Sequence, residues 1–96
     1  MGTSFTIVLY AADSRVASEA ATAAFQRIAA LEDIMSDYQA DSELNLLCEK
    51  PFGTPIPLSQ ELLDILLRSE HISRISDCAF DATVGPYVRL WRFALL

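Results

Sequence analysis

The sequence has few of the residues that build the best-known catalytic and metal sites. Its 96 residues include two cysteines, one histidine and three glycines. Structural zinc needs three or four Cys or His ligands, and Cys48 and Cys78 form no CxxC pair, so a zinc site is not expected. The glycines fit neither the P-loop nor the GxGxxG phosphate-binding pattern. His71, inside a predicted helix, is expected at the surface and not in a catalytic triad.

Basic residues are also scarce. Seven lysines and arginines stand against 13 acidic residues, for a formal net charge of −6, and they are scattered along the chain. Without a cluster of cations to neutralise a row of phosphates, nucleic-acid binding is not expected. No apolar run approaches the ~20 residues that span a bilayer. The N-terminal MGTSFTIVLYAAD has no basic stretch before its apolar part, so it predicts a strand and not a signal peptide.

Apolar side chains, in contrast, are abundant, at 52% of the residues. A domain of this size buries only roughly 60–65% of the surface that its unfolded chain exposes. The surplus apolar surface could be covered by a partner, by a ligand or by more of the same chain. The spacing of the two cysteines indicates no disulfide, and we expect both thiols to be buried among these apolar residues.

The first half of the chain predicts a strand and then a long helix. Residues 3–10 become continuously apolar and β-branched, which is typical of a strand with a buried face. Asp13 or Ser14 is expected to cap a helix over residues 15–36, which contain no Gly or Pro and carry apolar side chains at helical spacing. Its predicted buried stripe consists of Val16, Ala20, Ala24, Ile28, Leu31 and Met35.

The second half of the chain predicts loops and helices in alternation. Asp41 and Ser42 are candidate caps of a short helical turn, and the three prolines in residues 51–59 predict a loop. Ser59 is expected to cap a helix that ends near residue 76 or 77, and Pro86 is expected at the first position of a last helix, over residues 86–93. The predicted buried face of the Ser59 helix includes Leu62, Leu66, Ile72 and Ile75.

These elements predict the fold class α+β: an N-terminal strand, a long amphipathic helix and two further helices. A single strand cannot form a sheet, because its backbone groups need a neighbouring strand. The chain also finishes on the apolar RFALL. We therefore expect residues 1–96 to be the N-terminal part of one larger domain, incomplete without a C-terminal part.

Two stretches are candidates for ligand contact. Tyr38 stands among polar residues just after the long predicted helix, where its ring could stack on a planar ligand or fold back onto the core of its own helix. Asp81 lies in CAFDATVGPYVRLW, between Phe80 and the Gly-Pro corner. It could cap the last helix, accept local backbone N–H groups in an Asx-turn, or accept a hydrogen bond from a ligand.

Three blocks of the sequence together resemble the ApbE family of FAD:protein FMN transferases. They are MGT at the start of the predicted strand, MSDYQADSELNLL in the middle, and AFDATVGPYVRLW near the end, in the family's order and at compatible spacing. The resemblance implies an enzyme that splits FAD and attaches FMN to a threonine of a target flavoprotein. It departs from the family pattern at Arg92, where the family has glycine after the tryptophan.

The resemblance also implies a flavin site. Met1 matches the family's methionine at the flavin, Tyr38 matches the tyrosine that lies against the isoalloxazine, and Ala79, Phe80 and Asp81 match a short segment that contacts FAD. Mg²⁺ is implied as a further cofactor, with its ligands expected beyond residue 96, so that this chain alone should not catalyse transfer. Family members are typically periplasmic lipoproteins of the inner membrane, and an anchor of that kind is absent from this sequence.

Two other hypotheses stay open at this point. The chain could be a non-catalytic flavin-binding remnant, which keeps the Tyr38 and Asp81 surface but transfers nothing. It could also be a small helical domain whose exposed apolar face binds a protein partner. Added FAD discriminates between them, because only the flavin-binding hypotheses predict a response.

Overall fold

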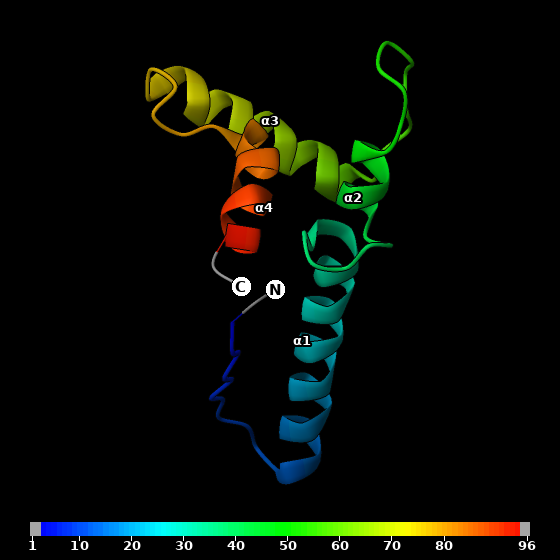
Figure 1. The fold of residues 1–96 in the computed structure, drawn as a ribbon. Helices are drawn as coiled ribbons and strands as arrows, with labels where there is room; N and C mark the ends of the chain where they lie inside the picture. The colour runs from blue at the N-terminus through cyan, green and yellow to red at the C-terminus, as the bar shows by residue number, and fades with distance from the viewer. Residues whose placement is uncertain (1–2, 95–96) are drawn as a thin grey trace. The chain divides into compact units, whose positions relative to one another are not determined.

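The computed structural model describes residues 3–94, which form helices joined by turns and loops (Figure 1). The helices are α1 (Ser14–Met35), α2 (Glu43–Cys48), α3 (Gln60–Ile75) and α4 (Gly85–Ala94), with a 3-10 turn, η1 (Ala82–Val84), just before α4. The chain divides into two compact units, Met1–Leu58 and Ser59–Leu96. Each unit is described separately below.

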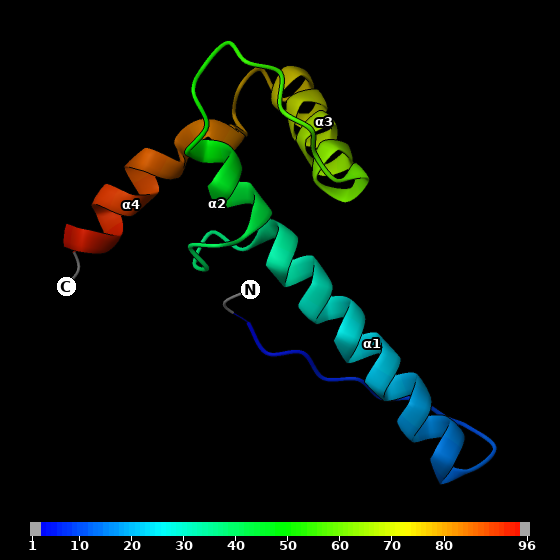
Figure 2. The same cartoon turned by 90° about the vertical axis from the view of Figure 1, so that its right-hand side faces the viewer.

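The predicted strand is not formed, and the α+β expectation is therefore wrong for residues 3–94, which contain no strand. Residues 4–11 have no regular secondary structure and run back along α1 in both views (Figures 1 and 2). Their side chains still alternate, since Ile7 and Leu9 are half-buried while Val8 and Tyr10 are 81% and 98% exposed. These residues do not form a strand because their backbone N–H and C=O groups need a neighbouring strand as their hydrogen-bond partner.

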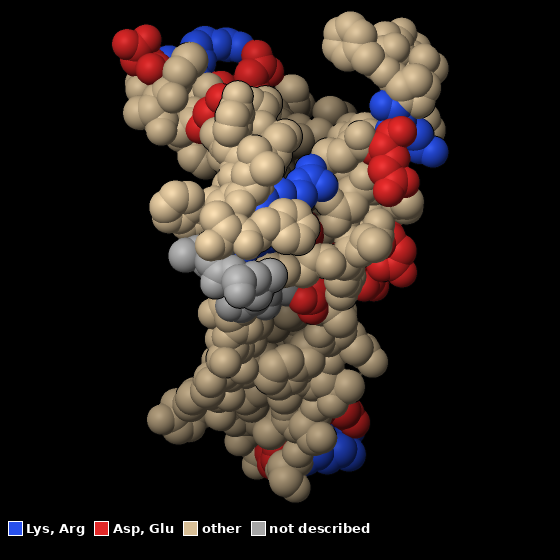
Figure 3. Space-filling view, in the orientation of Figure 1, with Lys and Arg blue, Asp and Glu red and all other residues tan. Residues whose placement is uncertain are grey.

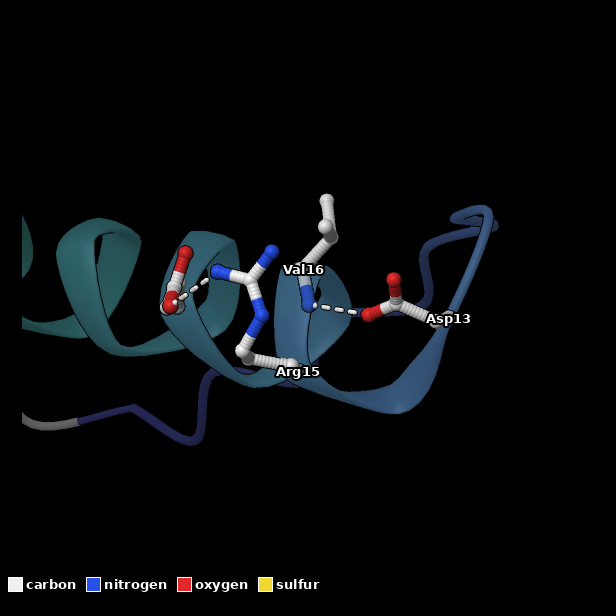
Figure 4. A network of polar contacts seen from close by, with 4 residues as sticks. Asp13, Arg15 and Val16 are labelled. Carbon is white, nitrogen blue, oxygen red and sulfur yellow. Dashed lines mark hydrogen bonds and ion pairs between the residues drawn. The ribbon is translucent and has the colours of Figure 1, made fainter.

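Helix α1 begins at the cap that the sequence indicates. Asp13 has an extended backbone, and its Oδ1 accepts a hydrogen bond of 2.9 Å from the Val16 N–H (Figure 4). In the same first turn, Arg15 donates to Glu19 at 2.8 Å in an exposed pair, worth only about 0.3–0.5 kcal/mol. The cap satisfies one of the N–H groups that have no partner within the helix, so it fixes where α1 starts.

The covered stripe of α1 differs from the predicted one in its first two positions. Val16 and Ala20 are exposed, whereas the half-buried positions of this part of the helix are Ala17 and Ala21. From Ala24 onward the predicted stripe is confirmed. In an alanine-rich first half, neighbouring faces have almost the same hydrophobicity, so the sequence pattern alone does not choose between them.

The second unit begins with Ser59, whose Oγ accepts from the Leu62 N–H at 3.2 Å and so caps α3 as predicted. Leu62 is 1% exposed and is the one large apolar side chain buried within residues 3–94. The predicted buried face is confirmed at Leu62, Leu66 is half-buried, and the prediction is wrong at Ile72 and Ile75, which are 44% and 69% exposed. Helix α4 starts one residue before Pro86, because η1 runs directly into it.

Large apolar side chains remain exposed in both units. In the first unit they include Phe5, Val8, Tyr10, Val16 and Phe25. Figure 3 shows a largely uncharged surface over the N-terminal segment and α1, with charged groups at the N-terminal end of the helix. Within residues 3–94, no helix combines the length and the apolar character needed to cross a bilayer.

Candidate functional site

Tyr38 lies on a turn that buried polar groups hold in place. The turn joins α1 to α2, and the two serines that flank it, Ser36 and Ser42, are 3% and 1% exposed. Ser36 Oγ accepts from the backbone N–H groups of Tyr38 at 3.3 Å and Gln39 at 3.2 Å. The backbone at the tyrosine is therefore fixed from inside the turn.

Ser42 and Asn45 close this turn onto the end of α1. Ser42 Oγ donates to the carbonyl of Ser36 and accepts from the Asn45 N–H at 3.2 Å, which caps α2 as predicted. The Asn45 side-chain amide donates to the carbonyls of Ser36 at 3.2 Å and Gln39 at 2.7 Å. No buried side-chain polar atom of the described residues lacks a hydrogen bond, so these bonds offset the cost of removing the polar groups from water.

The Tyr38 side chain is 65% exposed, so it is not folded into the core of its own helix. An exposed ring on a turn fixed by hydrogen bonds offers a flat surface without a large ordering cost on binding. Sequence analysis missed the residues that build this support. Ser42 was identified only as a cap, and Asn45 carried no signal, because its side-chain contacts span six to nine residues along the chain. Ser36 was identified only as the end of the predicted helix, although its bonds to Tyr38 and Gln39 are local.

In the second unit, α3 ends in a turn that is usually made by glycine. The Cys78 N–H donates to the Ser73 carbonyl at 2.8 Å and the Asp77 N–H to the Arg74 carbonyl at 3.4 Å, the two bonds of a Schellman motif. Asp77 and Cys78 both have positive φ, 51° and 61°. A side chain in this left-handed region is unfavourable, so two such residues in succession are held there by the surrounding hydrogen bonds.

Ser76 fastens the predicted flavin segment to the end of α3. Its backbone carbonyl accepts from the Ala79 N–H at 3.1 Å, and its Oγ accepts from the Phe80 N–H at 3.1 Å. Figure 1 shows the chain turning back after α3 before α4 begins. Sequence reasoning placed Ser76 only as a helix end and did not identify this second role.

Asp81 forms the local turn that was one of its three predicted alternatives. Its Oδ1 accepts from the Thr83 N–H and from the Thr83 hydroxyl, both at 2.8 Å, and this arrangement caps η1. The backbone N–H and then the hydroxyl of Thr83 hold the pKa of Asp81 below its usual value, because both bonds favour the charged form. Asp81 does not cap α4, since η1 lies between them.

A groove of about 450 Å³ lies between the second half of α3 and the segment that follows it. Asp81 and Thr83 line one side, and polar groups of α3 line the other, including the exposed ion pair of Glu70 and Arg74 at 2.6 Å. The remaining lining residues are Leu66, Ser69, Ser73, Cys78 and Ala82. A groove with an apolar floor and a few directed polar groups is typical of a small-molecule site.

The predicted site residues fall in different places. Asp81 lines the groove, whereas Ala79 and Phe80 are exposed beside it in the chain and are not among its lining residues. Tyr38 belongs to the first unit, and Met1 lies outside the described residues. The flavin-contacting role of all five remains a prediction.

The described residues contain no metal centre. Nowhere in residues 3–94 do three or more His, Cys, Asp or Glu side chains gather in a way that could hold a metal ion. These residues therefore provide no cluster that would hold Mg²⁺ through three or more protein side chains. The two cysteines are free and exposed, which corrects the expectation that they are buried.

Comparison with known proteins points in one direction. The ApbE family profile matches residues 1–95. Curated relatives described as FAD:protein FMN transferases include those of Salmonella typhimurium, 32% identical over 97% of this chain and 27% of the relative, and Escherichia coli K12, 31% identical over 97% and 26%. The Haemophilus influenzae relative is 36% identical over 68% of this chain and 20% of its own. The chain thus spans about a quarter of the length of these relatives. No solved structure matches it.

Proposed function

Because the chain belongs to the ApbE family, we propose that it forms the flavin-binding part of an FAD:protein FMN transferase. The observation that carries the proposal is that Asp81, in the family-matching AFD segment, lines the groove of the second unit. The partners proposed are FAD and a target flavoprotein. We also propose that residues 3–10 join a sheet in a longer protein, whose fold class is then α+β.

The proposed reaction is a phosphoryl transfer. The hydroxyl oxygen of the acceptor threonine attacks the phosphorus on the FMN side of the pyrophosphate, the bridging P–O bond breaks, AMP leaves and the hydroxyl proton is released. Mg²⁺, where it is bound, neutralises charge that develops on the pyrophosphate. Residues 3–94 contain no cluster of three or more candidate metal ligands, so we assign them no part in this step and expect the 96-residue chain to bind FAD without transferring FMN.

Tyr38 is proposed as the stacking surface for the isoalloxazine ring. The support is its 65% exposure and the fixed backbone beneath it. An aromatic pair contributes about 0.5–1.5 kcal/mol beyond the area that it buries. Removal of the ring should therefore weaken FAD binding measurably.

The test is titration of FAD with the chain, followed by flavin fluorescence and its anisotropy. Wild type should quench the flavin, and Tyr38→Ala should reduce affinity roughly tenfold, because both the stacking and the buried ring area are lost. Tyr10→Ala is the matched control, since Tyr10 is a 98% exposed tyrosine of the same unit. Equal losses in the two variants would contradict the stacking role, and no response of wild type to FAD would contradict flavin binding itself.

A further inference from the structure

We infer that Thr83 is a positioning residue for the flavin site: it occupies one carboxylate oxygen of Asp81 with two donors and leaves the other for a hydrogen-bond donor of FAD. The inference rests on the proposed function and extends it, because Thr83 is not among the predicted flavin contacts. It also specifies which kind of chemical group of FAD can bind beside Asp81.

The geometry supports this role directly. Both donors of Thr83 reach the same oxygen of Asp81, Oδ1, at 2.8 Å. Both of these hydrogen bonds end on one oxygen of the carboxylate, so Oδ2 is the oxygen that we assign to a ligand. A carboxylate held by two donors on one oxygen has lost most of its rotational freedom before a ligand arrives, which lowers the ordering cost of binding.

The charges around the groove indicate which chemical group of FAD can bind beside Asp81. The other titratable groups lining it are Glu70, Arg74 and Cys78, and the first two neutralise each other in their ion pair. Asp81 therefore faces the groove as an anion without a compensating cation among these lining residues. Such a site repels phosphate and accepts an N–H or O–H group, so it takes a neutral, hydrogen-bond-donating part of FAD and not the pyrophosphate.

A purely structural role for Thr83 makes a different prediction. If Thr83 only caps η1, its loss should lower stability and leave the pH dependence of binding unchanged. If Thr83 holds Asp81 for the ligand, loss of the hydroxyl raises the pKa of Asp81, because one of the two bonds that favour the anion is gone. Binding that needs the anion would then disappear at a higher pH as the solution is acidified.

The experiment measures the affinity of the 96-residue chain for FAD by fluorescence anisotropy from pH 7.5 down to about pH 2.5, because the pKa of Asp81 lies below its usual value and the acid limit of binding must fall inside the range. Thr83→Val removes the hydroxyl but keeps the β-branched shape and the backbone N–H. It should weaken FAD binding roughly threefold to tenfold at neutral pH, the range expected for one exposed hydrogen bond to a charged group, and shift the acid limit of binding upward. Thr83→Ser keeps the hydroxyl and should match wild type in both respects.

Two further variants separate positioning from folding. Ser59→Ala removes the side-chain cap of α3 in the same unit and should lower stability without moving the pH limit. In an Asp81→Asn background, Thr83→Val should add little further loss, because it acts through the carboxylate. An unchanged affinity and pH limit in Thr83→Val, or an equal shift in Ser59→Ala, would overturn the inference while FAD binding by wild type stands. Failure of wild type to bind FAD would instead overturn the proposed function, and the inference with it.

Discussion

At the scale of single residues, the strain in this chain is concentrated next to the candidate site. Asp77 and Cys78 adopt left-handed backbone conformations directly before the segment that leads to Asp81. Most helices that end in this way use glycine at the first of these positions, because it has no Cβ to clash. The side chains at these two positions therefore lower the stability of the protein. One of them, Cys78, is a residue that lines the groove.

Replacement of Asp77 by glycine should stabilise the end of α3. A left-handed conformation costs a non-glycine residue about 1–2 kcal/mol, and the greater freedom of glycine in the unfolded chain offsets part of that, so we expect a gain of about 0.5–1 kcal/mol. The measurement is amide hydrogen exchange over residues 70–80, together with thermal unfolding followed by circular dichroism.

Asp64→Gly is the matched control for this prediction. The same substitution is made there in the interior of α3, where φ is helical, and it should destabilise by about 0.3–0.5 kcal/mol through helix propensity, with a further small loss because Asp64 accepts a hydrogen bond from Gln60 at 2.7 Å. A destabilising effect of the same size at position 77 would show that the positive φ carries no cost there.

At the scale of elements, the boundaries of the helices followed from local signals. Asp13, Ser42 and Ser59 each accept a backbone N–H three residues ahead, and each was recognisable as a cap from its residue type. The strand was not confirmed because it depends on a distant partner: residues 3–10 have strand composition but no neighbouring strand within residues 3–94. η1 was not predicted as an element, although the Asp81–Thr83 bonds that form it are local and were one alternative among three.

The turn between α1 and α2 provides a test at this scale. Ser42→Ala removes both the cap of α2 and the hydrogen bond to the carbonyl of Ser36, at a position that is 1% exposed. We expect a loss of about 1–2 kcal/mol in local stability, seen as faster amide exchange over residues 36–48.

The same change should weaken FAD binding if the turn positions Tyr38. Ser14→Ala, at an exposed serine whose side chain has no hydrogen bond within the described part of the chain, should change neither quantity. Unaltered exchange in Ser42→Ala would mean that the buried hydroxyl contributes nothing to holding the turn.

At the scale of the whole chain, most of the available hydrophobic stabilisation is not realised within the two units. One large apolar side chain, Leu62, is buried in the described residues, and such burial contributes about 1.5–3 kcal/mol. The sequence is 52% apolar, so most of this surface faces outward. The apolar fraction could be read from the sequence, but which apolar side chains are buried could not. The pattern of a helix shows which of its faces is apolar and does not show which element covers that face.

Self-association of the chain should therefore depend on pH. At neutral pH the net charge of −6 keeps molecules apart, and near the isoelectric point of about 4.5 that repulsion vanishes. Sedimentation velocity should show a larger share of oligomers at pH 5 than at pH 7.5. Val8→Lys, at an 81% exposed apolar position, should reduce association at both pH values. A monomer at both pH values would contradict this expectation.

The end of α3 and the carboxylate of the candidate site form one mechanical unit. The last turn of the helix is tied to the following segment through Ser73, which accepts from Cys78, and through Ser76, which accepts from Phe80. Fraying of that turn would release the chain that carries Asp81. A ligand that binds Asp81 only while this turn is closed must in return lower the population of the frayed state, because the two equilibria are linked. The last turn of α3 thus serves as a latch, and its opening equilibrium is a property of the site as much as of the helix.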